Sequence, residues 1–222
     1  MEEGRKEGRK EGRKEMGMRK RKRKRKREVG REGNRKEEKE GDGNENEGGR
    51  EGRRETARVA RFVAHVCDWG ALATISTQDP PMRGQPFANV FSVSDGPVGK
   101  GSGVPYMYLT ELEISVHDLK VNANASLTMS LAQTSYCKKQ GYDPQNPLCA
   151  HVIFYGVVEK VQNDTEADFA KTALFSRHPE MAFWPKGHNW FFAKLNIINI
   201  WLLDFFGGIK TITPEDYFNA VP

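Results

Sequence analysis

The first quarter of this 222-residue chain has almost no apolar side chains. Residues 1–57 contain no aromatic residue, and their only hydrophobic residues are Met1, Met16, Met18, Val29 and Ala57. That is too little apolar area to offset the conformational entropy lost on folding. The rest of the chain holds all 22 aromatic residues. We therefore expect a disordered charged tail, residues 1–55, followed by one compact domain, residues 56–222.

Several motifs are also missing. No run of 18 apolar residues occurs, which excludes a membrane-spanning helix, and no apolar segment follows the charged start, so no secretory signal peptide is visible. The five histidines have neither HExxH nor H-x-x-x-H-type spacing, and G-x-S-x-G is absent. A zinc site and a hydrolase nucleophile elbow therefore have no support. The glycine-rich segment Asp95–Val104 lacks P-loop spacing and precedes strand-like sequence, which argues against a phosphate loop.

The tail carries the basic charge of the protein. Residues 1–57 have 22 basic and 15 acidic side chains, whereas residues 58–222 have 13 and 15. Arg and Lys alternate without interruption over Arg19–Arg27, a pattern typical of nuclear-localisation or nucleic-acid-binding segments. However, residues 1–55 consist almost entirely of Glu, Gly, Arg and Lys, the residues of purine-only codons. We therefore interpret the tail as a translated purine-rich repeat and keep a nuclear nucleic-acid binder as an alternative. The compact domain itself has no basic footprint for direct nucleic-acid binding.

Hydrophobic periodicity predicts the elements of the domain. A helix is expected between Thr56, its N-cap, and Gly70, which stands just past its end. Further helices are expected over 115–123 and 165–178, and a last turn begins at Pro214. Strands are expected over residues 71–76, 86–94, 105–110, 125–132, 151–161, 190–205 (bent or broken near Asn196) and 210–213. Residues 95–104 and 137–149 are expected to be loops. Strands joined by hairpin-like turns predict an antiparallel barrel with helices packed outside it.

Two pairs of residues are candidates for covalent modification. Cys137 and Cys149 flank a turn-rich segment; in an oxidising compartment they would form a disulfide and under reducing conditions two thiols, and their spacing alone does not decide. Asn124-Ala-Ser and Asn163-Asp-Thr are N-glycosylation sequons. Asn163 is the stronger candidate because it lies between a strand and a helix, where a loop exposes the amide.

Several long strings of the domain resemble one known family. ARFVAHVCDWGALATIST, RGQPFANVFSVSDGPVGKGSGVPYMYLT, SLTMSLAQTSYCKKQGYDPQNPLC, LFSRHPEM and HNWFFAKLNIINIWLLDFFGG are similar, in order and spacing, to the CREG family, the cellular repressors of early-viral-protein-stimulated genes. The resemblance extends from Thr56 to about Phe218.

The resemblance implies a split β-barrel like that of the pyridoxamine-phosphate oxidases that bind flavin mononucleotide (FMN), assembled as a homodimer. It also implies a secreted and lysosomal glycoprotein linked to growth restraint and differentiation. Family members are not established enzymes, and they bind the cation-independent mannose-6-phosphate receptor, also called the insulin-like growth factor 2 receptor, through their glycans. The word "repressor" in the family name is not a sign of direct DNA contact.

Departures from the family sharpen these expectations. Where relatives carry sequons this chain reads Asn196-Ile-Ile and Asn219-Ala-Val, so receptor binding would depend on Asn163 and Asn124. The flavin groove of related barrels is expected to be obstructed by loop residues, and we expect no cofactor. A flavin-dependent oxidoreductase is the alternative, and Ser76, Arg83 and Lys194 are candidates for its phosphate site only by composition.

Overall fold

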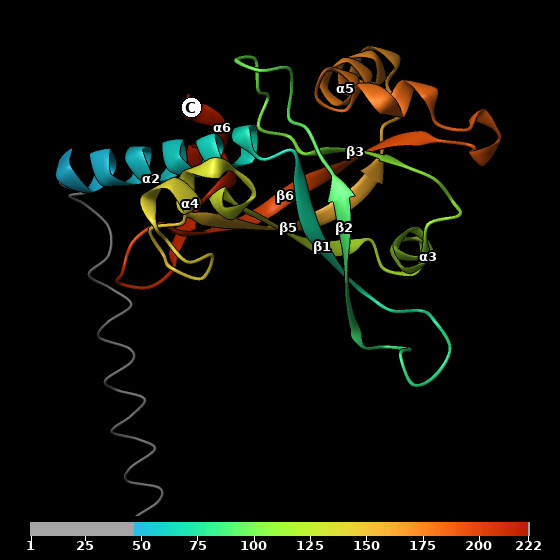
Figure 1. The fold of residues 1–222 in the computed structure, drawn as a ribbon, viewed down its shortest axis with the longest axis horizontal. Coiled ribbons are helices and arrows are strands. Elements are labelled where there is room, and N and C mark those ends of the chain that lie inside the picture. The colour runs from blue at the N-terminus through green and yellow to red at the C-terminus, as the bar shows by residue number, and fades with distance from the viewer. Residues whose placement is uncertain (1–46, 222) are drawn as a thin grey trace, which may run out of the picture. The chain divides into compact units, whose positions relative to one another are not determined.

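The computed structural model describes residues 47–221, and the labels below are those of Figure 1. The helices are α2 (Glu47–Val66), α3 (Ile114–Val121), α4 (Ser135–Gln140), α5 (Asp164–Arg177) and α6 (Pro214–Asn219). The strands are β1 (Trp69–Ile75), β2 (Pro86–Ser92), β3 (Tyr106–Leu109), β4 (Asn124–Ser130), β5 (His151–Lys160), β6 (Phe191–Leu203) and β7 (Lys210–Ile212). Short 3-10 turns span Leu131–Gln133, Pro179–Phe183 and Lys186–His188. The basic run Arg19–Arg27 and the disorder predicted for residues 1–46 lie outside the described residues.

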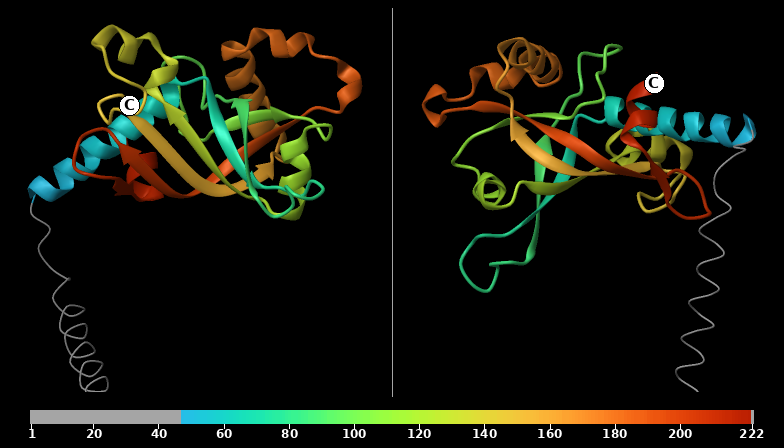
Figure 2. Two further views of the ribbon diagram at one scale, coloured as in Figure 1. Left: turned by 60° about the horizontal axis from the view of Figure 1, so that its bottom comes forward. Right: turned by 180° about the vertical axis from the view of Figure 1, so that it is seen from behind.

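All strands join one antiparallel sheet. Its order is β2-β1-β4-β5-β6-β3, with β7 added to β6. A single bridge between Ser94 and Tyr106 connects the segment after β2 to β3, so the two ends of the sheet meet. Helices α2, α4 and α5 lie along its outside (Figure 1), and two further views show the curvature of the strands (Figure 2). The predicted antiparallel barrel with peripheral helices is therefore confirmed.

The core follows from alternation along the strands. In β4 the buried side chains are Ala125, Leu127 and Met129, and the residues between them are more exposed. Because successive side chains of a strand point to opposite faces, this period of two places one face of the sheet in the core. Leu127 and Phe154 on neighbouring strands are both fully buried there.

Strand β6 is continuous, so of the bend or break expected near Asn196 there is no break, and an irregularity of the strand lies close to that residue. A β-bulge shifts the register of β5 against β6, so that Tyr155 pairs with Asn199 and Gly156 with Ile197. A side chain at Gly156 would collide with the carbonyl of Asn196, so only glycine permits this close approach. The bulge accommodates the register shift, and β5 and β6 stay paired on both sides of it.

Helix α2 differs from its prediction at both ends. It begins at Glu47, so residues 47–55, assigned to the tail, are helical; Glu and Arg favour helices even where no apolar stripe is present. It ends at Val66, and both Trp69 and Gly70 belong to β1. Gly70 is not a helix stop: a side chain there would lie 2.6 Å from the Cδ1 atom of Leu127 in the core.

The segment from Cys137 to Cys149 is also more ordered than expected. It was predicted as a loop, yet α4 begins at Ser135, with the Thr134 side chain capping its N-terminus, and ends at Gly141 in the left-handed region. Ser, Thr and Gly at these positions are typical helix boundary signals, but the helix is too short for its hydrophobic period to show in the sequence.

No helix among residues 47–221 is both long and apolar enough to cross a membrane.

A buried carboxylate ties α3 to the barrel. Asp118 accepts hydrogen bonds from the hydroxyl of Thr74 at 2.8 Å and from the amide and hydroxyl of Thr77 at 2.7 and 2.8 Å. Burial alone would raise the pKa of this carboxyl, but the hydrogen bonds outweigh burial and the pKa is lowered. Asp118 is therefore a charged structural anchor at the end of β1.

Candidate functional site

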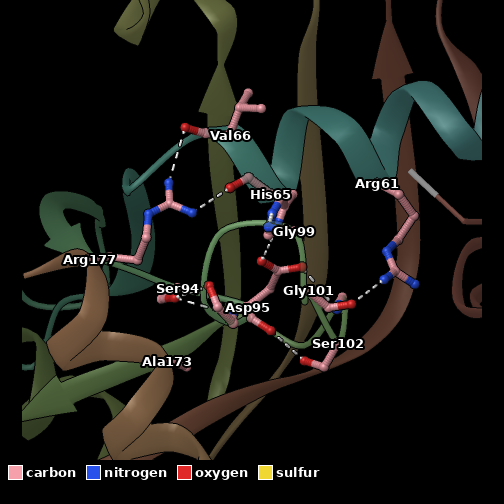
Figure 3. A network of polar contacts seen from close by, with 12 residues as sticks. Arg61, His65, Val66, Ser94, Asp95, Gly99, Gly101, Ser102, Ala173 and Arg177 are labelled. Atoms are coloured by element: carbon pink, nitrogen blue, oxygen red, sulfur yellow. Dashed lines mark hydrogen bonds and ion pairs between the residues drawn. The ribbon is translucent and has the colours of Figure 1, made fainter.

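A dense polar network lies where α2 meets the loop Asp95–Gly103 (Figure 3). His65, near the end of α2, places Nδ1 2.7 Å from the Asp95 carboxylate and accepts a hydrogen bond at Nε2 from the amide of Gly99 at 2.9 Å. Asp95 also accepts from the Gly103 amide at 3.0 Å. The imidazole therefore joins the start and the tip of the loop to the helix.

Arg61, one helical turn earlier, completes the attachment. Arg61 is 5% exposed, and its guanidinium donates to the Gly101 carbonyl at 2.8 Å and lies over the ring of Tyr217. Gly103 makes this possible, because a side chain there would lie 2.8 Å from the guanidinium carbon, and its φ of +85° favours glycine. The Tyr217 hydroxyl donates to the Gly103 carbonyl at 2.9 Å, and burial raises the pKa of that phenol.

Helix α5 supports the network from the other side. Arg177 donates to the carbonyl oxygens of His65 and Val66 at 2.8 and 3.2 Å. These are among the last carbonyls of α2, which have no partner within the helix, so Arg177 caps its C-terminus.

The arrangement resembles part of a catalytic triad but does not offer its chemistry. In Ser-His-Asp sites, the imidazole nitrogen opposite the carboxylate faces a hydroxyl nucleophile. Here that nitrogen, Nε2 of His65, accepts from the Gly99 amide instead. The geometry holds a loop in place and leaves no free base. A cleft of about 690 Å³ runs beside it, lined by Arg61, His65, Lys100 and Phe218 among others.

The three candidates for a flavin phosphate site are each used elsewhere. Ser76 is buried at the end of β1, where its hydroxyl accepts from the Gln78 amide at 3.2 Å. Arg83 is exposed in the β1–β2 turn and pairs with Asp79 at 3.3 Å. Lys194 in β6 pairs with Glu166 of α5 at 2.8 Å. Among residues 47–221, no hydrogen bond or ion pair joins any two of the three candidates.

Lys194 forms an ion pair that holds two elements together. Glu166 accepts from Lys194 through both carboxylate oxygens and from the Tyr106 hydroxyl at 3.2 Å. Burial, with a smaller contribution from the Glu166 charge, raises the pKa of Tyr106. The cluster fastens α5 to β6 and β3.

The two sequon asparagines have different surroundings. Asn163 is exposed and caps α5: its Oδ1 accepts from the Glu166 amide at 3.0 Å, which leaves Nδ2, the atom that a glycan modifies, unused by the cap. Asn124, at the start of β4, is exposed too, but its Nδ2 donates to Asn122 at 2.9 Å and its Oδ1 accepts from Tyr155. Asn163 is therefore the better-placed acceptor.

The cysteines have separate roles. Cys137 and Cys149 are joined by a disulfide with Cα atoms 5.4 Å apart. Cys67 is a buried free thiol, and burial raises its pKa to about 12. It is thus the small buried hydrophobe that its place at the end of the apolar helix face suggested. Among residues 47–221, no group of three or more His, Cys, Asp and Glu residues is placed to hold a metal ion.

Sequence reasoning missed His65, Asp95 and Arg61. The sequence around His65 shows no metal-ligand spacing, and the glycines of the loop draw attention to phosphate binding rather than to a histidine partner. The one available signal was a glycine-rich loop that begins with an aspartate. Its partner lies 30 residues earlier, a separation that carries no local period.

Comparison with known proteins decides the family. The family model described as "CREG, beta-barrel" matches residues 51–219. The chain belongs to the CREG family. It is 68% identical over 168 residues to Protein CREG1 of Gallus gallus, covering 75% of this chain and 86% of that protein. Identity to Protein CREG1 of Homo sapiens is 65% over 164 residues, or 74% of each chain. Protein CREG2 of Homo sapiens is 42% identical, with 75% of this chain and 57% of that protein covered.

Solved structures identify the fold of this CREG chain. A heme binding protein from Mycobacterium smegmatis superposes with a TM-score of 0.59 at 19% identity, covering 74% of this chain and 60% of that one. A Clostridium acetobutylicum protein related to general stress protein 26, of the pyridoxinephosphate oxidase family, gives 0.50 at 11% identity, with 74% and 98% covered. At these identities the likeness shows the fold alone, and the predicted split barrel of pyridoxamine-phosphate-oxidase type is confirmed.

Proposed function

We propose that this CREG protein is a non-enzymatic, secreted and lysosomal glycoprotein that works as a homodimer in the control of cell growth and differentiation. In this proposal, its glycan at Asn163 is bound by the cation-independent mannose-6-phosphate receptor. The main support is the geometry of Asn163. The asparagine is exposed on an ordered helix start, and the atom that carries the sugar is not the atom that caps the helix.

Two further observations agree with this proposal. The disulfide between Cys137 and Cys149 suits an oxidising compartment. The most obvious candidate for acid–base chemistry, His65, has both ring nitrogens engaged in holding a loop. The flavin oxidoreductase alternative has no comparable support, since Ser76, Arg83 and Lys194 are each engaged with other partners.

The test uses the sequon without disturbing the helix cap. Thr165→Ala removes the sequon and keeps Asn163, whereas Thr165→Ser keeps both and serves as the matched control. Each full chain is directed into the endoplasmic reticulum of cultured cells by an added signal peptide and passed over immobilised receptor. We expect wild type and Thr165→Ser to bind and to elute with free mannose 6-phosphate, and Thr165→Ala to lose most binding.

Asn124→Gln measures the share of the second sequon, which we expect to be minor. Peptide mass spectrometry of the endogenous protein then reads its N-terminus, the disulfide and the sugar at Asn163 together. An unmodified Asn163 with free thiols in that protein, or full receptor binding by Thr165→Ala, would contradict the proposed function.

A further inference from the structure

The protonation state of His65 is fixed by its two partners. Its Nδ1 faces the carboxylate of Asp95 at 2.7 Å, which can only accept, so Nδ1 carries a proton. Its Nε2 faces the amide of Gly99 at 2.9 Å, which can only donate, so Nε2 carries none. The contact as it stands therefore needs a neutral imidazole (Figure 3).

A second proton would break one of these contacts and keep the other. Protonated Nε2 would face the Gly99 amide donor to donor, so that hydrogen bond could not persist. The contact with Asp95 would instead become a charge-assisted hydrogen bond, which is stronger. Histidine is the side chain whose charge ordinarily changes between about pH 5 and 8.

The segment that depends on the broken contact is short and exposed. Within residues 47–221, the Gly99 amide makes the one hydrogen bond between residues 97–100 and α2. The other bond in this turn is internal, from the Lys100 amide to the Pro97 carbonyl at 2.9 Å. Val98 at its tip is 81% exposed, so no core packing holds it.

The flanks of the loop are held independently of His65. The Ser102 amide donates to the Asp95 carbonyl at 2.7 Å, and Arg61 holds the Gly101 carbonyl. Loss of the Gly99 contact would therefore free the turn 97–100 without unfolding the rest of the loop.

The charges around His65 have opposing effects. Asp95 in the loop favours the imidazolium, while Arg61 on α2 and Lys100 in the turn, both in the wall of the same cleft, disfavour it. Arg177 of α5, bonded to the His65 carbonyl, disfavours it as well. Tyr217 of α6 is neutral and bonded to Gly103. Because the Asp95 carboxylate is bonded directly to the ring, it stabilises the positive charge of the imidazolium once the turn has moved away.

We propose that His65 is an acid-sensitive latch. Protonation of Nε2 releases the turn Pro97–Lys100 from α2, leaves Asp95 bound to the ring, and opens the cleft that His65 and Lys100 line. The device goes beyond the proposed function and does not depend on glycan or receptor.

Two substitutions of His65 imitate the two states. Gln places its carboxamide oxygen near Nε2, so His65→Gln keeps an acceptor for Gly99 at every pH. Asn places its amide near Nδ1, so His65→Asn keeps a donor for Asp95 but no acceptor for Gly99. His117→Gln is the matched control, because His117 lies at the far side of the fold, on α3, bonded to the Glu111 carbonyl.

The experiment follows the turn between pH 7.5 and 4.5 in the full chain. The Gly99 amide is observed by NMR, and a fluorophore is attached through Val98→Cys; Cys67 does not compete because burial raises its pKa to about 12. At the acidic end of this range, we expect the Gly99 amide of wild type and His117→Gln to exchange about threefold to tenfold faster than that of His65→Gln at the same pH. At the neutral end, the three should exchange alike.

His65→Asn is expected to resemble the acid state throughout, and His65→Gln the neutral state. A wild-type profile as flat as that of His65→Gln would overturn the proposal. So would a midpoint that persists unchanged in His65→Gln, because another group would then be the sensor.

Discussion

Two segments that lie against α2 are held in different ways. The segment Cys137–Cys149 is closed by a disulfide and shares an apolar cavity of about 520 Å³ with Val59 and Phe62 of the helix. The loop Asp95–Gly103 is held by hydrogen bonds to His65 and Arg61. Covalent and apolar contacts do not respond to protonation near neutral pH, whereas a neutral imidazole does. One helix thus supports a segment that is insensitive to pH and a loop that can respond to it.

Removal of the disulfide should have the largest effect. Cys137→Ala with Cys149→Ala frees a loop of 12-residue separation, and we expect unfolding free energy to fall by about 3 kcal/mol because the unfolded chain regains loop entropy. For a domain of this size that lowers Tm by roughly 6–12 °C, which thermal circular dichroism measures. The loss should be the same at pH 5 and pH 7.5. Cys67→Ala is the control, at about 1 kcal/mol; a strongly pH-dependent loss in the double variant would erase the contrast between the two segments.

A change at Asp95 should have the next largest effect. Asp95→Asn can still accept from Gly103, but its amide now faces His65 as a donor and forces the ring to carry its proton on Nε2. That proton opposes the Gly99 amide, so we expect a cost of about 1–3 kcal/mol in urea unfolding and a shifted Gly99 resonance at neutral pH. Asp79→Asn, on an exposed ion pair, should change stability by less than about 0.5 kcal/mol. Equal effects of the two variants would show that the loop does not rely on its buried carboxylate.

The exposed turn at Arg83 should have the smallest effect. Arg83→Met removes an ion pair whose partner Asp79 is almost fully exposed, and we expect a change within about 0.5 kcal/mol. Lys194→Met is the comparison, with a cost of about 1 kcal/mol because its pair with Glu166 is three-quarters buried and joins β6 to α5. A loss above about 1 kcal/mol for Arg83→Met in chemical denaturation would mean that this turn is more than a solvated connection.

Local periodicity predicted the strands and helix α5 to within a few residues. The alternation of β4 and the capped start of α5 at Asn163 depend on residues that are neighbours in the sequence, so no tertiary information is needed to predict them. The start of α2 at Glu47 was missed because its first turns carry no apolar stripe. Helix α4 was missed because six residues are too few to show a helical period.

The polar site could not be predicted in the same way. His65 and Asp95 meet only because the closed sheet brings the end of α2 to the loop after β2. Lys194 illustrates the converse. From composition it was a candidate to bind a flavin phosphate, but its charge is neutralised by Glu166, whose position depends on how α5 packs. Contacts across the fold decide both cases, and hydrophobic patterning does not encode them.

Strand β6 has a consequence for how the protein is made. Its 13 residues pair with β5, β3 and β7, so three strands depend on one that lies close to the C-terminus. As the chain leaves the ribosome, β3 and β5 present unpaired edges until residues 191–203 have emerged. Such edges are sites of aggregation. A nascent chain that stalls before Phe191 therefore has no way to complete the sheet, and its unpaired edges stay exposed until residues 191–203 have been synthesised.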